Sequence, residues 1–88
     1  MLFKKNIKTE FKELIEMLKT TDFREVDLKE IEEFVFNREE HLAIDQAITQ
    51  LYEFDIKISL ALYSKIKEIA KRLKLKKSEY EILEKLIR

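Results

Sequence analysis

Residues 39–54, "EEHLAIDQAITQLYEF", show the clearest helical periodicity of apolar side chains in this chain. Its buried-type side chains recur every three or four positions, at Ile44, Ala47, Ile48 and Leu51. That spacing places them on one face of an α-helix, whereas a strand would alternate apolar and polar residues. We therefore predict a helix over residues 39–54 whose apolar stripe faces a core.

The same periodicity continues on both sides of this helix. It predicts four more helical segments: residues 4–19, a segment from Asp27 to Asn37, a segment capped by Ser59 that runs to Leu73, and a last segment opened by Ser78. Between the third and fourth helices, the "DIKIS" at residues 55–59 alternates apolar and polar residues and predicts a short extended connector.

Several of these helix ends carry recognisable signals. Asp27 with Glu30, and Ser78 with Glu81, have the spacing of capping boxes, in which two side chains satisfy free N–H groups of the first turn. The pair Val26 and Ile31 has the spacing of a hydrophobic staple on the second helix. Asn37 is expected to end that helix in the left-handed conformation.

Chain length and composition limit the chain to one small domain. The sequence has 88 residues, of which 45% are apolar and 41% charged, so it predicts one globular domain with one modest core. Short connections between amphipathic helices favour neighbours that run antiparallel. We predict an all-α fold, a compact bundle of four to five short helices that forms a single domain over residues 1–88.

Composition disfavours several classes of function. The chain has no Gly, no Pro and no Cys, which excludes glycine-rich phosphate loops, disulfides and a thiolate nucleophile. Its only histidine, His41, lies four residues before Asp45, but a metal site needs three or four convergent ligands. We expect no catalytic residues, no metal, no cofactor and no small-molecule ligand, and therefore no enzyme.

Hydropathy bears on location. No stretch approaches the roughly 18 apolar residues of a membrane span, and the N-terminus lacks the apolar run of a secretory signal. The expected location is the cytoplasm, with no membrane partner.

The zero net charge of the chain conceals a gradient along it. Residues 27–58 carry nine acids against three bases, a balance of −6, while residues 59–88 carry nine bases against four acids, a balance of +5. Such asymmetry in a small domain predicts that the two parts meet different electrostatic partners.

The acidic middle contains the candidate binding site. On a helical wheel His41, Asp45, Thr49 and Tyr52 share one flank of the helix at residues 39–54. With the neighbouring acids, the candidate partner-binding residues are Glu39, Glu40, His41, Asp45, Thr49, Tyr52, Glu53 and Asp55. The aromatic, carboxylate and hydrogen-bonding groups are those that anchor protein interfaces, although a merely solvated helix face has the same composition.

Two further classes of function stay open. Residues 63–86 resemble a helix-turn-helix, and a basic cluster from Lys65 to Lys77 could contact phosphates. Its second helix, however, opens with Glu79 and Glu81 instead of base-reading side chains, which disfavours nucleic acid as a partner. The other class is a helical adaptor or self-associating module, in which the basic end of one copy meets the acidic middle of another.

Residues 37–75, "NREEHLAIDQAITQLYEFDIKISLALYSKIKEIAKRLKL", resemble the MafI-like immunity proteins. The matching features are the acids that open a helix at Glu39 and Glu40, Ala43 followed by Asp45, and "QLYEFDIKIS" leading into a helix rich in Lys and Glu. The resemblance implies a small helical antitoxin that binds and neutralises the C-terminal domain of a toxin used in contact-dependent growth inhibition, commonly a nuclease. A basic nuclease would complement the acidic middle of this chain.

Overall fold

The computed structural model describes residues 5–88, and within them the fold is all-α. These residues form four α-helices: α1 (Ile7–Leu18), α2 (Glu25–Phe36), α3 (Glu40–Glu53) and α4 (Leu60–Arg72). Two short 3₁₀ helices follow, η1 (Lys77–Glu79) and η2 (Glu81–Leu86). The predicted fold class is confirmed, and the start predicted for the first helix, residue 4, lies outside the described residues.

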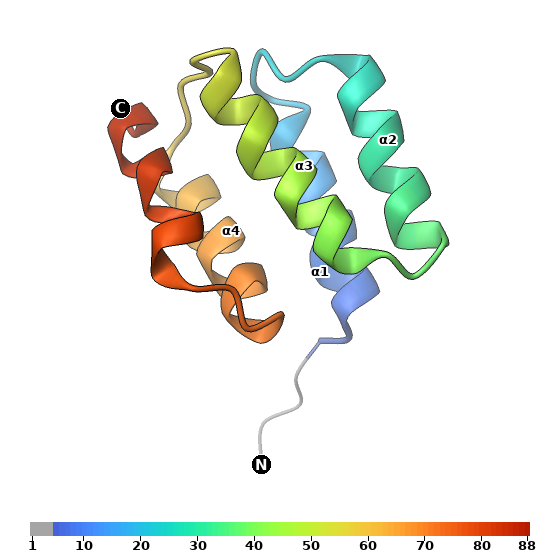
Figure 1. The fold of residues 1–88 in the computed structure, drawn as a ribbon. Coiled ribbons are helices and arrows are strands. Elements are labelled where there is room, and N and C mark those ends of the chain that lie inside the picture. Colours follow the sequence, from blue (N-terminus) through green and yellow to red (C-terminus); the bar gives the residue numbers. More distant parts are fainter. Residues whose placement is uncertain (1–4) are drawn as a thin grey trace.

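Consecutive α-helices run in opposite directions, so the chain goes up, down, up and down around one core (Figure 1). Helix α2 packs chiefly against α3, and α1 packs against α4. The last segment returns along α3, where η2 contacts that helix. The predicted stripe of α3 lies inside the core, with Ile44, Ala47 and Leu51 fully buried.

The connector at residues 55–59 is extended, as predicted. Ile58 forms an isolated β-bridge with Ile87, and the Ile58 N–H donates to the Leu86 carbonyl oxygen at 3.0 Å. Ser59 then caps α4, because its side-chain oxygen accepts a hydrogen bond from the Leu62 N–H at 3.0 Å. This bridge fixes the C-terminal segment beside the start of α4.

Three helices end in the left-handed conformation although the chain has no glycine. Arg38, Asp55 and Lys74 follow α2, α3 and α4 with φ values of 61°, 50° and 63°. In each case the next N–H reaches back to close a Schellman motif, as when Glu39 N–H donates to Phe34 O at 2.7 Å. The prediction for Asn37 is wrong by one residue, since Asn37 has φ −89° and Arg38 takes the left-handed position.

The predicted start of the second helix is also wrong. Helix α2 begins at Glu25, so Asp27 lies within its first turn and is only 3% exposed. Val26 is 56% exposed while Ile31 is fully buried, so the two do not form the predicted staple. Burial of Asp27 between α2 and α3, where it has better hydrogen-bond partners, outweighs the local capping signal.

The last predicted helix forms two 3₁₀ helices instead of an α-helix. Tyr80, Leu83 and Leu86 are spaced by three, which aligns them on one face of a 3₁₀ helix, and all three are buried. The capping box predicted at Ser78 is not formed. Instead, the Glu79 carboxylate accepts a hydrogen bond from the Lys76 N–H at 2.8 Å.

Within residues 5–88, no helix combines the length and the apolar character that a bilayer crossing requires.

Candidate functional site

The predicted strip of α3 lies on the solvent side of that helix. His41, Asp45, Thr49 and Tyr52 are all exposed, and the Tyr52 side chain is 47% exposed. From His41 to Tyr52 the strip extends about 17 Å along α3, at 1.5 Å per residue. An exposed aromatic of this kind is a type of residue that anchors protein interfaces.

One member of the strip, His41, is committed to the fold. Its Nε2 lies 2.9 Å from the carbonyl oxygen of Leu73, the residue that ends α4. Because a carbonyl oxygen only accepts, Nε2 carries the proton and donates. The bond satisfies one of the free carbonyls at the end of α4 and fixes the start of α3 against it. His41 is therefore a structural contact between two helices, which the sequence pattern did not indicate.

The flanking acids differ in how far they are neutralised inside the molecule. Asp55 lies 3.7 Å from Lys57, whereas the other four form no ion pair within residues 5–88: Glu39, Glu40, Asp45 and Glu53. Glu30 and Glu33 of the adjacent α2 likewise have no basic partner in that part of the chain. We call these carboxylates the acidic surface; its members are Glu30, Glu33, Glu39, Glu40, Asp45 and Glu53.

A polar cluster centred on the buried Asp27 joins α2 to α3. The Asp27 carboxylate accepts hydrogen bonds from Arg24 Nε at 2.8 Å and from Gln50 Nε2 at 3.2 Å. Gln46 Nε2 donates to Asp27 at 3.3 Å and also to the Glu30 carboxylate. Hydrogen bonding to Asp27 raises the pKa of Arg24, which therefore stays charged. The cluster makes the two helices one rigid platform for their carboxylates.

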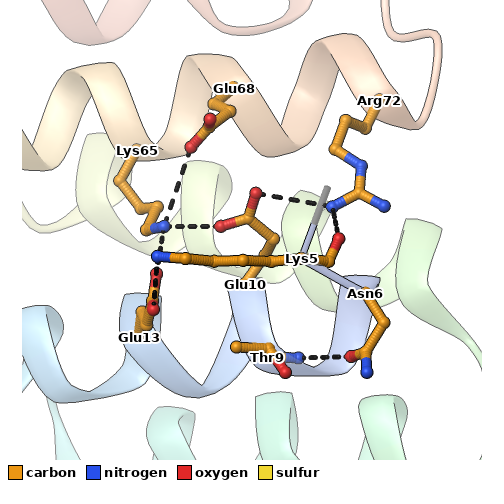
Figure 2. A network of polar contacts seen from close by, with 8 residues as sticks. All are labelled: Lys5, Asn6, Thr9, Glu10, Glu13, Lys65, Glu68 and Arg72. Carbon is orange, nitrogen blue, oxygen red and sulfur yellow. Dashed lines mark hydrogen bonds and ion pairs between the residues drawn. The ribbon is translucent and has the colours of Figure 1, made fainter. Parts of the chain in front are cut away.

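A second network joins α1 to α4 (Figure 2). Lys65 Nζ lies 2.6 Å from Glu10 Oε1 and 2.5 Å from Glu13 Oε1, and Arg72 Nη1 lies 3.4 Å from Glu10 Oε2. Hydrogen bonds from Lys5 and Lys65 lower the pKa of Glu13. The third acid of α1, Glu16, pairs with Lys19 at 3.0 Å. Every acid of α1 is thus neutralised within the molecule, unlike those of the acidic surface.

This network also changes how the basic cluster of residues 65–77 is interpreted. Lys65 and Arg72 are bound to acids of α1 and are not available to phosphates. The segment expected to act as a recognition helix is two 3₁₀ helices whose apolar face is buried. A recognition element must present a free helical face to the major groove. The helix-turn-helix interpretation therefore loses its geometric basis.

Three exposed apolar side chains on the α2–α3 pair were not predicted from the sequence. Leu42 on α3 is 47% exposed, and Val26 and Phe36 on α2 are 56% and 83% exposed. A helical wheel already places Leu42 off the stripe of Ile44, Ala47 and Leu51, so that signal was present. Val26 was not recoverable, because its pattern suggested a staple that the true start of α2 removes.

A metal centre has no support in the described part of the chain. Across residues 5–88, no group of three or more His, Cys, Asp or Glu side chains is placed to hold an ion. Neither a hydrogen bond nor an ion pair links His41 to Asp45 there.

The chain was compared with families, curated proteins and solved structures. No family model, no curated protein and no solved structure matches the chain.

Proposed function

We propose that this chain is an immunity-type inhibitor, which binds a basic toxin domain and blocks it by covering its substrate-binding surface. One observation carries the proposal. The acids of α1 are each paired inside the molecule, whereas the six carboxylates of the acidic surface have no basic partner within residues 5–88. Like charges held close together are unfavourable by themselves, and a basic partner would relieve that repulsion.

The chemistry of the partner follows from the sign of this surface. Nucleases hold the phosphates of their substrate with Lys and Arg, so their active sites are basic. A rigid array of carboxylates can occupy the same positions as the phosphates of a nucleic acid. Long-range attraction between the two surfaces also speeds encounter, and this contribution weakens as salt is added. A toxin domain with nuclease activity is therefore the partner that we propose.

Charge alone does not hold a complex together, since rim charges contribute more to the rate of association than to lifetime. The apolar side chains beside the acids would supply the lasting contact. Tyr52, Leu42 and Val26 are each about half exposed and lie on the same pair of helices. Aromatic residues that become buried at the centre of an interface are those that dominate binding energy.

Co-expression tests the proposal directly. The candidate partner is the C-terminal domain of the protein encoded immediately upstream of this gene. We expect cells that produce this domain to survive only when the chain is also present, and the purified pair to co-elute on a sizing column. Survival that is unaffected by the chain, with no co-elution, would refute the immunity function for this pair.

Replacing Tyr52 with Ala tests the apolar contact. We expect the complex to dissociate about 30-fold faster, corresponding to about 2 kcal/mol, with little change in the rate of association. The side chain is 47% exposed in the free chain, so its loss should leave the melting temperature nearly unchanged. Surface plasmon resonance measures both rates. Thr49→Ala, one turn earlier on the same flank, is the matched control, and equal rates for the two variants would show that Tyr52 is not an anchor.

A further inference from the structure

The most exposed large apolar side chain of the described residues lies outside the acidic surface. Phe36 is the last residue of α2 and is 83% exposed. It borders a shallow hollow that it shares with Lys29, Glu32 and Glu33. A phenyl ring left in water forgoes most of the free energy that its burial would provide, so this position is energetically unfavourable for an isolated monomer.

A groove between α1 and α2 adjoins this hollow, since Glu32 lines both. It has a volume of about 210 Å³. Its apolar lining consists of Ile15, Val35 and the fully buried Phe11, and its charged lining of Lys8, Lys12, Glu16 and Glu32. An apolar cavity of about 150 Å³ accommodates a benzene molecule, so the groove has room for one phenyl ring. The same surface therefore presents both a protruding ring and a hollow of matching size.

In the described part of the chain, unpaired lysines lie at the groove and unpaired acids at the ring, with Glu32 bordering both, while Glu16 of the groove pairs with Lys19. Lys8 and Lys12 of α1 line the groove, and neither forms an ion pair within residues 5–88. Glu32 and Glu33 border Phe36, and they too have no ion-pair partner in that part of the chain. Placing the Phe36 ring of one molecule in the groove of another brings these acids toward those lysines.

We propose that the surface formed by α1 and α2 binds a second copy of this chain as a two-fold symmetric dimer. In such an interface the same patch serves both subunits, so a contact from one to the other is made twice. Phe36 of each protomer occupies the groove of its partner, and Glu32 and Glu33 of each face Lys8 and Lys12 of the other. The dimer uses Glu33 of the acidic surface but neither Asp45 nor Tyr52. It goes beyond the proposed function and does not rest on it.

Sedimentation of the full chain over a range of concentrations tests the dimer. We expect the mass to rise from that of the 10.7 kDa monomer toward twice that value as concentration increases. Phe36→Ala should raise the dissociation constant of the dimer about tenfold or more. Leu60→Ala removes another exposed apolar side chain, 63% exposed at the start of α4, and should have no effect. Circular dichroism checks that both variants are folded.

A mixing experiment then distinguishes contacts between chains from effects within one chain. Lys12→Glu and Glu32→Lys should each weaken self-association, because each places like charges opposite one another at both ends of the interface. Mixing the two variants in equal amounts should restore association, because acids on one chain then face lysines on the other. Adding Phe36→Ala to both variants should abolish this rescue. Three results would each overturn the proposal. The native chain could stay monomeric at every concentration up to about 1 mM, or the Phe36→Ala variant could dimerise like the native chain. The third is a mixture that associates no better than its components.

Discussion

Replacement of Lys65 with Met is expected to lower the free energy of unfolding by about 3 kcal/mol, a large part of the stability of a domain this small. Met keeps most of the apolar stem of Lys65 but removes the ammonium. The Glu10 carboxylate, whose side chain is 5% exposed, would keep only Arg72 at 3.4 Å as a charged partner. An incompletely paired charge in a buried position is costly because it has lost its hydration.

The matched control is Lys67→Met, which removes a lysine of the same helix that forms no ion pair within residues 5–88. Urea denaturation followed by circular dichroism gives the free energy of unfolding of each variant. Adding Glu10→Gln to Lys65→Met should recover part of the loss, because the uncompensated charge is then gone. If Lys65→Met were no more destabilising than Lys67→Met, the network between α1 and α4 would not stabilise the fold.

Two pKa shifts of this network give its pH dependence. Burial alone lowers the pKa of Lys65, but hydrogen bonds to Glu10 and Glu13 outweigh it, so the pKa lies above the ordinary 10.5. The contribution of charged Lys65 to the free energy of unfolding is therefore complete below pH 10.5 and is lost as pH rises through the raised pKa. The pKa of Glu13 is lowered, so its pH dependence has the opposite sign. The contribution of charged Glu13 to the free energy of unfolding is present above pH 4.5 and is lost as pH falls through the lowered pKa. The network is therefore fully formed at neutral pH.

Local patterns predicted the parts of the fold that depend on local physics. The helix of residues 39–54, the cap at Ser59 and the extended connector all follow from neighbours in sequence, and all are found in the structure. Asp27 shows where this reasoning fails. Its spacing suggested an N-cap, yet its hydrogen-bond partners include Gln46 and Gln50, which only tertiary packing brings close. A single local signal cannot be weighed against contacts between residues about 20 positions apart.

The prediction of an α-helix for the last segment was wrong for a related reason. Tyr80, Leu83 and Leu86 repeat every three residues, a period that fits both a short α-helix and a 3₁₀ helix. The bridge between Ile58 and Ile87 then holds the end of the segment against the connector, and this bridge has no signature in sequence.

The candidate site was predictable as a helix face but not as a set of available groups. Asp45, Thr49 and Tyr52 lie where a helical wheel places them. The bond from His41 to Leu73, and the pairing of Lys65 with Glu10, join residues 32 and 55 positions apart. Local pairs such as Glu16 with Lys19 follow from spacing along the helix, but these long-range pairings are set by the tertiary structure.

Reversing three charges of the acidic surface is expected to have the largest effect on binding. The variant carries Glu39→Lys, Asp45→Lys and Glu53→Lys, which raises the net charge of the chain from 0 to +6 because each reversal adds two units. Like charges would then face each other across the interface, and association should slow by about tenfold or more. All three positions are exposed, so the domain should stay folded.

The matched control reverses Glu16, Asp22 and Glu81, which lie on α1, on the loop after it and on η2. It changes the net charge by the same amount outside the acidic surface. Association that slows equally in this control would indicate an effect of net charge rather than of the acidic surface.

Binding of a basic partner by the acidic surface is tested by the rate of association with the upstream-encoded toxin domain, measured at several salt concentrations. The native chain should associate rapidly at low salt, with a rate that falls steeply as salt is added. The variant reversed at Glu39, Asp45 and Glu53 should associate slowly, lose the steep salt dependence and fail to protect cells. If the reversed variant had the native rate, the native salt dependence and full protection, the acidic surface would not be the binding site.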